Sequence, residues 1–522
     1  MELATEIVYQ VAGALLQWLL SPFYWLSMLF IALYYRRQIV MERRLFAVKM
    51  RSWIEQTWHT MLGGLIAGLI VSAAVIGLGI TFSREIMFVL WGLALLFMLI
   101  RVRFLCLAYA AGALALIQMG LNVFAQGWVP EGWMGTAVHA VRTFDAAGLL
   151  VLVALLHAAE AWLIRKQAVR FASPLFLESK RGRIVGAYQM QSMWPVPLFM
   201  LFPTMTAGTT IPWTPLFGGD VWLQGWSVIA FPIVIGFSEL TFTRLPQEKA
   251  SVSASRLFAY AAVLLALGLA AKFWAPLLPV AAIMAVVLHE GLIWFSRREE
   301  IERSPIFTHD GRGLRVLAVL PDSPAAELGI RTGEVIVRAN GIQVRTKEQL
   351  HQALRANAAF CKLEVLNYAG EVRFLQRALY AGEHHQLGAL LAPDNRVSYV
   401  AVARQPSLFA LLLVAPWRQA RNRKAERADE QVAATSEMAD SGGVAIVSEV
   451  SSLDSSYNSH SSNSLDSSDI PGGMGSSGSR DSLSSPDSLS SSSSEETTQP
   501  LPRRGANKGK KQDGGAEVSS SV

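Results

Sequence analysis

The sequence is poor in charged residues and in cysteine. Only 16% of its 522 residues are Asp, Glu, Lys or Arg, whereas 52% are hydrophobic. This balance is too apolar for a soluble chain of this length and indicates a polytopic membrane protein. The two cysteines, Cys106 and Cys361, form neither a disulfide framework nor a metal-binding spacing. The sequence therefore predicts no disulfide scaffold, no metal site and no cofactor.

Excess charge of one sign is also nearly absent. The formal net charge is only +6, and the basic residues are grouped between apolar segments instead of forming one patch. We therefore expect no nucleic-acid partner. A cleavable signal peptide is not expected either, because the first apolar segment is long and has no basic leader.

Nine apolar segments approach or reach the roughly 20 helical residues that span a bilayer. Backbone groups in hydrocarbon must be hydrogen-bonded internally, so each segment is predicted to be a helix. The third and sixth are short, which leaves eight spans as an alternative. The segments are 11–34, 60–80, 86–100, 104–124, 143–164, 188–204, 226–243, 257–274 and 277–296. Residues 1–298 are thus predicted to be an α-helical polytopic membrane bundle of eight or nine helices.

The distribution of Lys and Arg predicts how this bundle is oriented. Basic residues follow the first, third, fifth, seventh and ninth segments, whereas the connections 125–138 and 205–225 contain none. Lys and Arg accumulate in cytoplasmic loops. We therefore expect the N-terminus outside the cell membrane and the residues after the last span in the cytoplasm.

Five ionisable residues lie within the predicted spans, where such residues are costly and often functional. They are His157, Glu160, Glu239, His289 and Glu290, all toward the predicted cytoplasmic ends. A shared ligand or metal site and separate contacts to neighbouring helices or the interface both fit this placement. We favour the separate contacts.

His289-Glu290 also begins a pattern that zinc proteases use. Those enzymes carry His-Glu-x-x-His, which places two zinc ligands one helical turn apart with a general base beside them. Here Ile293 stands at the position of the second histidine. The chain is therefore predicted not to be an enzyme, and no catalytic residue is assigned.

Residues 313–392 have the pattern of a small α+β domain. Ser323 and Thr346 are suited to cap helices, and Asn340-Gly341 favours a tight hairpin turn. The predicted elements are strands at 314–320, 335–337, 361–366 and 371–375, a short helix from Pro324 and a second helix over Lys347 to Arg355.

This segment resembles a PDZ domain of the bacterial type, as found beside HtrA proteases. The resemblance rests on Gly313-Leu-Arg-Val-Leu-Ala-Val-Leu-Pro-Asp-Ser-Pro324 and the run that continues to Gly341. The Gly-Leu-Gly-Ile-like strand that precedes this run in HtrA-type domains has its counterpart after it, at Leu387-Gly-Ala-Leu-Leu391. We therefore predict a circularly permuted PDZ domain whose last strand forms the groove. The alternative is that 387–391 is an ordinary closing strand.

The resemblance implies that the domain binds an extended peptide, usually a chain end, by adding it as a strand beside a helix. One wall of the groove is then formed by the strand and the other by the second helix. The peptide-binding residues implied in this way are Leu387, Gly388, Ala389 and Leu390 of the strand and Lys347, His351 and Leu354 of the helix.

The rest of the chain is predicted to carry no further domain. Residues 299–312 are read as a linker, and 393–427 as a flanking segment with either an interfacial helix or a helix packed on the PDZ domain. Residues 428–500 hold twelve acidic residues against one basic residue and few aromatic ones. We expect the Ser-rich segment 428–522 to be a disordered tail.

The chain resembles the MinJ family of Gram-positive cell-division proteins in two respects. It has several spans followed by one PDZ domain, and its PDZ segment ends in His384-His385-Gln-Leu-Gly-Ala-Leu-Leu-Ala-Pro393. The long tail departs from that family. The resemblance implies an integral membrane scaffold at septa and poles, with DivIVA-like and MinD-like partners besides peptide ligands and the lipid bilayer. The alternatives are an accessory or regulator of membrane proteolysis, and a membrane sensor or transporter with a PDZ module.

Overall fold

The computed structural model describes residues 2–48, 50–179, 182–203, 213–217, 225–357, 359–378 and 387–393. The flanking segment beyond residue 393 and the Ser-rich tail, with the predictions made for them, lie outside the described residues.

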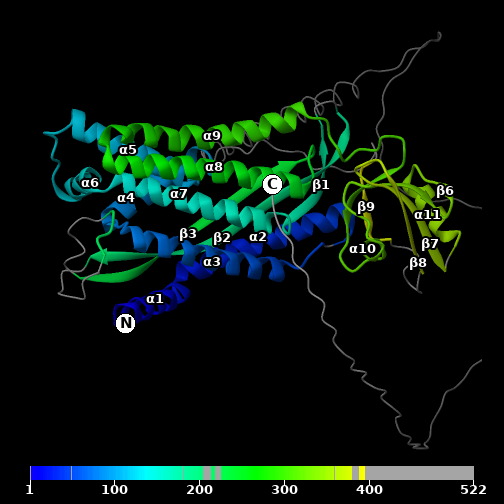
Figure 1. Cartoon of the computed structure of the whole chain (residues 1–522), viewed down its shortest axis with the longest axis horizontal. Coiled ribbons are helices and arrows are strands. Elements are labelled where there is room, and N and C mark those ends of the chain that lie inside the picture. The colour runs from blue at the N-terminus through cyan, green and yellow to red at the C-terminus, as the bar shows by residue number, and fades with distance from the viewer. Residues whose placement is uncertain are drawn as a thin grey trace, which may run out of the picture. The chain divides into compact units, whose positions relative to one another are not determined.

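Helices dominate the first 302 residues (Figure 1). They are α1 (Glu2–Leu20), α2 (Pro22–Phe46), α3 (Trp53–Leu78), α4 (Arg84–Ile100), α5 (Leu107–Phe124), α6 (Gly132–Thr143), α7 (Ala146–Leu163), α8 (Pro246–Phe273) and α9 (Leu278–Glu302). Among the described residues, five helices are long and apolar enough to cross a membrane, or six if α1 and α2 together form one broken span. That pair bends by 57°. The bend falls at Ser21, because the residue before a proline disfavours the helical conformation.

Two of the predicted spans, 188–204 and 226–243, are wrong, because the chain forms strands instead of helices over residues 188–203 and 226–241. β2 (Ile184–Pro203) and β3 (Trp226–Thr241) pair antiparallel from Tyr188↔Thr241 to Pro203↔Trp226. The shorter β1 (Ala172–Glu178) pairs with the beginning of β2. Figure 1 shows β2 and β3 as two long neighbouring arrows among the helices. The prediction of eight or nine membrane helices is therefore not supported.

Prolines explain why this segment avoids the helical conformation. Pro195 and Pro197 lie within β2, and Pro197 stands opposite Pro232 of β3. Inside a helix each proline would remove a hydrogen bond and clash with the preceding turn, at a cost of about 3 kcal/mol or more. A strand accepts proline where its missing N–H would point away from the ladder.

Glycines on α3 allow this helix to cover the outer edge of β2. A methyl group on Gly64 or Gly68 would overlap the carbonyl oxygens of Pro195 and Pro197, respectively. Four helical residues rise about 6 Å, close to the roughly 6.6 Å of two strand residues. Residues four positions apart on α3 therefore lie beside every second residue of β2.

Side-chain oxygens accept hydrogen bonds from N–H groups of both hairpin strands. Ser72 of α3, four residues after Gly68, accepts from the Phe199 N–H through its Oγ at 2.8 Å. On β3, Oε1 of Gln10 in α1 accepts from the Val228 N–H at 3.0 Å. These contacts satisfy backbone donors that burial among apolar helices would otherwise leave unpaired.

The PDZ-like region contains a second sheet with strand order β8-β7-β5-β4-β9, and β6 pairs with β5. Its elements are β4 (Leu314–Val319), α10 (Pro324–Glu327), β5 (Val335–Ala339), β6 (Ile342–Gln343), α11 (Lys347–Arg355), β7 (Phe360–Leu366), β8 (Val372–Ala378) and β9 (Ala389–Leu391). Both predicted helix caps are confirmed, since Ser323 accepts from the Ala326 N–H and Thr346 forms a capping box. Asn340 and Gly341 have φ angles of 50° and 83°, as the predicted turn requires.

The predicted linker 299–312 contains a fully buried aromatic residue. Phe307 is 0% exposed and packs with Phe176 and Tyr188 of the first sheet and with Leu317 of β4. The Gly186 N–H donates to the Phe307 carbonyl at 3.0 Å, and the Tyr188 hydroxyl donates to the Leu317 carbonyl. We call this group the junction cluster; its buried members are Phe176, Tyr188, Phe307, Leu317 and Ala318. It joins β4 to the sheet formed by β1, β2 and β3, which we call the hairpin sheet.

Candidate functional site

Strand β9 forms one edge of the PDZ sheet. It pairs antiparallel with β4, and its ladder is continued by hydrogen bonds of 2.8 Å from Ala392 N–H to the Arg315 carbonyl and from Leu320 N–H to the Gly388 carbonyl. Because bonding direction alternates along a strand, the backbone groups of Ala389 and Leu391 point away from β4. Among the described residues no strand pairs with that side. The edge therefore offers backbone donors and acceptors to an added strand.

Gly388 fixes the start of this edge strand. Its φ angle is 79°, which residues with a side chain rarely adopt, and a Cβ there would overlap the side chain of Ser323. The Leu387 carbonyl accepts a hydrogen bond of 2.8 Å from the Ala325 N–H. The beginning of β9 is therefore held against the start of α10.

The predicted groove residues occupy different environments. Leu387 and Leu354 are 9% and 5% exposed and share one core cluster, whereas Lys347 and His351 are exposed on α11. Leu390 contacts the junction cluster, while Ala389 packs against the PDZ core. The structure thus brings Leu387 and Leu354 together and turns Leu390 to the opposite face of β9.

Two cations, Lys347 and Arg355, and one carboxylate, Glu348, act on His351 along α11. Partial burial, and then the charges of Lys347 and Arg355, lower the pKa of His351 below its usual 6.5. The imidazole is consequently neutral near pH 7 and can donate and accept hydrogen bonds. Lys347, one turn earlier on the same helix, supplies the cation on this wall.

Two of the five ionisable residues predicted within spans have charged partners of their own. Glu290 forms an ion pair of 2.7 Å with Arg103. Glu239 accepts a hydrogen bond of 2.6 Å from Ser253 and lies 3.6 Å from the ammonium group of Lys249. These contacts match the separate partners that were favoured from the sequence.

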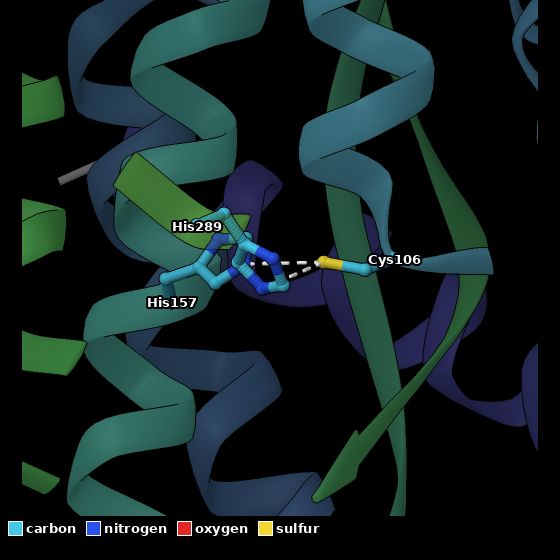
Figure 2. Close-up of side chains that lie close together, drawn as sticks. All are labelled: Cys106, His157 and His289. Carbon is cyan, nitrogen blue, oxygen red and sulfur yellow. Dashed lines mark hydrogen bonds between the residues drawn. The ribbon is translucent and has the colours of Figure 1, made fainter. Parts of the chain in front are cut away.

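The two histidines, in contrast, meet at a cysteine (Figure 2). His157 of α7 and His289 of α9 direct their Nε2 atoms at Cys106 Sγ, which lies at the start of α5, with distances of 3.3 and 3.5 Å. Ligand atoms of the three residues lie within 4.8 Å of one another. We call this group the Cys-His cluster. Spacing along the chain gives no sign of it, because its members are far apart in sequence.

Comparison with known proteins identifies the PDZ region and finds relatives that match most of the chain. A family model described as "PDZ domain" matches residues 315–366. The protein "Cell division topological determinant MinJ" of Bacillus subtilis (strain 168) is 30% identical over 387 residues, covering 72% of this chain and 94% of the relative. "Probable cell division topological determinant MinJ" of Lacticaseibacillus paracasei is 25% identical over 299 residues, covering 54% of this chain and 78% of the relative. No solved structure matches.

A region with several membrane-length helices followed by a PDZ domain defines a PDZ-containing membrane protein. The likeness to the Bacillus subtilis protein extends through most of both chains. The chain belongs to the MinJ family of cell division topological determinants.

Proposed function

We propose that this protein is an integral membrane scaffold for division-site placement, and that its PDZ domain recruits partners by adding an extended peptide to β9. The observation that carries this proposal is the position of β9, which has β4 on one side and no strand on the other among the described residues. Peptide addition at such an edge uses backbone hydrogen bonds for affinity and side-chain pockets for specificity.

The second wall of the proposed groove is the face of α11 that carries Lys347, His351 and Leu354. These residues recur every three to four positions and so share one side of the helix. Leu354 is buried and provides an apolar floor, while Lys347 and His351 are exposed and available to a ligand. A positive wall with an apolar floor suits a peptide that carries both an apolar side chain and a carboxylate.

The proposed orientation places the N-terminus outside and the PDZ domain and C-terminus in the cytoplasm. Two predicted spans are replaced by the β2–β3 hairpin, which leaves and returns on one side. Seven predicted spans remain: the α1–α2 pair, α3, α5, α7, α8 and α9, which are long and apolar enough to cross a membrane, and α4, which has 17 residues. With α4 counted as a span the number of crossings stays odd, so the side on which the chain ends does not change. The alternation of basic residues therefore still supports a cytoplasmic PDZ domain.

We infer that the partners are DivIVA-like and MinD-like division proteins and that the protein is enriched at septa and poles. The support for this inference is membership of the MinJ family, whose named function is cell division topology. Confinement to a membrane raises the effective concentration of the groove for other membrane-bound proteins. A micromolar affinity, about −8 kcal/mol, then suffices for reversible recruitment, and no catalytic activity is needed.

Two tryptophan substitutions on α11 test the groove. His351→Trp fills the proposed groove, whereas Gln352→Trp places the same side chain at the next exposed position of the helix. We expect His351→Trp to reduce the recovery of partners with the full-length protein at least about 10-fold, corresponding to a loss of 1.4 kcal/mol. Gln352→Trp should leave recovery unchanged.

Fluorescent fusions of the same variants test the cellular role. We expect the wild type and Gln352→Trp at septa and poles of dividing cells, and His351→Trp along the whole membrane. A uniform distribution of the wild type would contradict the division role. Undiminished partner recovery with His351→Trp would instead show that the groove is assigned wrongly.

A further inference from the structure

We propose that Cys106, His157 and His289 bind a single soft or borderline transition-metal ion, Zn²⁺ or Cu⁺. Three helices that are distant in sequence bring one sulfur and two imidazole nitrogens to one point (Figure 2). Thiolate and imidazole are the ligands that both ions prefer in proteins. The cluster is separate from the proposed peptide groove, and the proposal does not depend on that function.

The distances between the ligand atoms fit a metal site. Typical zinc–sulfur and zinc–nitrogen bonds with a tetrahedral angle between them place sulfur and nitrogen about 3.6 Å apart. Cys106 Sγ lies 3.3 Å from His157 Nε2 and 3.5 Å from His289 Nε2. An ion can therefore enter between these atoms with movements of a few tenths of an ångström.

In both histidines the ring nitrogen that does not face Cys106, Nδ1, has a hydrogen-bond partner. His157 Nδ1 lies 2.7 Å from the Val153 carbonyl, which only accepts, so Nδ1 carries the proton and Nε2 presents its lone pair to the cluster. His289 Nδ1 lies 3.1 Å from the Tyr109 hydroxyl, which can accept a proton donated by Nδ1. Such outer partners fix the tautomer and the orientation of metal-binding histidines.

An aromatic ring packs against the two histidines of the cluster. The Tyr260 ring packs edge-on against both imidazoles, with centroid distances of 5.1 Å to His157 and 5.7 Å to His289. His157 is only 3% exposed. Binding requires the Cys106 thiol to lose its proton, which is released to the medium as the metal ion takes its place on sulfur. One thiolate and two neutral imidazoles then make a neutral site with Cu⁺, or a singly positive site with an open fourth position with Zn²⁺.

Without an ion, the same residues form a hydrogen-bonded chain. The Tyr109 hydroxyl can donate to His289, His289 Nε2–H to Cys106 Sγ, and the Cys106 thiol to His157 Nε2. This arrangement satisfies every group, so the contacts alone do not require a metal. We favour the metal ion because two Nε2 atoms converge on one sulfur. Metal analysis distinguishes the metal-bound arrangement from the hydrogen-bonded chain.

The test is metal analysis of the full-length protein, purified in detergent without a polyhistidine tag. Zn²⁺ and Cu⁺ are added in separate samples, and excess ion is removed before analysis. We expect about one ion per chain for the wild type with one of the two ions. Cys106→Ser and His157→Gln should each lower occupancy below about a tenth of that value. The matched controls Cys361→Ser and His139→Gln change the same residue types outside the cluster and should keep full occupancy.

A milder variant keeps the proposal testable if the ligand variants fail to fold. Tyr109→Phe removes only the outer partner of His289, and its affinity for the ion should fall roughly 10-fold, with full occupancy at high metal concentration. Cobalt added to the wild type should produce a thiolate-to-metal absorption band that Cys106→Ser lacks. The proposal is overturned if the wild type binds neither ion, if Cys106→Ser retains full occupancy, or if Tyr109→Phe binds as tightly as the wild type.

Discussion

A single lysine connects the helical region to the end of the hairpin. Lys249 is 1% exposed, and its ammonium group lies 2.8 Å from Ser296 Oγ, 3.2 Å from Glu300 and 3.6 Å from Glu239. Glu300 also accepts hydrogen bonds from the backbone N–H groups of Phe242 and Thr243, just after β3. Buried charges persist only where they are paired and hydrogen-bonded in this way.

Lys249→Met should therefore be strongly destabilising. The change leaves two carboxylates near one another without their shared cation, and breaking a buried pair typically costs about 3–5 kcal/mol. Thermal unfolding in detergent measures the loss as a lower Tm. Lys272→Met is the matched control, because Lys272 is 31% exposed in its pair with Asp145 and should cost about 1 kcal/mol or less. Equal Tm values for the two variants would contradict this account of Lys249.

Residues whose role is local were predictable from the sequence, and those in distant clusters were not. Ser323 and Thr346 act on backbone groups three residues away, so their capping roles follow from the neighbouring sequence. Cys106 acquires partners only when α5, α7 and α9 pack together. The sequence separations of 51 and 183 residues to its two histidines leave no recognisable spacing.

Hydrophobic length alone misidentified the β2–β3 hairpin as two membrane helices. Both strands are apolar over the length of a span, and β2, which is buried on both faces, lacks the alternation that identifies a half-exposed strand. The informative signal was the pair Pro195 and Pro197, which a helix of that length tolerates poorly. The strands of the PDZ region were predictable because turn and capping residues separate them.

Close packing of α3 against β2 can be tested with two glycines of the same helix. A methyl group on Gly68 meets the backbone of Pro197, whereas nothing lies within 4 Å of a methyl group on Gly77. Gly68→Ala should thus cost about 1–3 kcal/mol through overpacking, despite the higher helix propensity of alanine. Gly77→Ala should leave the Tm unchanged or raise it slightly. A higher Tm for Gly68→Ala than for Gly77→Ala would show that α3 and β2 are not in close contact.

At the scale of the whole described chain, β4 belongs to two clusters at once. Leu314 and Val316 lie in the PDZ core, while Leu317 and Ala318 lie in the junction cluster with Phe307. Both faces of β4 are therefore covered, which accounts for the unbroken apolar run from Val316 to Val319. The strand that pairs with the proposed peptide edge is also the strand that contacts the hairpin sheet.

Phe307→Ala should loosen this attachment without disturbing the PDZ core. Truncating a fully buried phenylalanine typically costs about 3–5 kcal/mol, and tenfold in an equilibrium corresponds to 1.4 kcal/mol. Local opening of residues 303–312 should accordingly rise by about 100-fold or more, and trypsin should cleave after Arg303 or Arg312 faster in the variant. Phe374→Ala, whose side chain is 68% exposed on β8, is the control and should be cleaved at the wild-type rate. If Phe307→Ala resists trypsin as well as this control does, the junction cluster does not hold the PDZ domain, and β9 is presented to partners on a free tether.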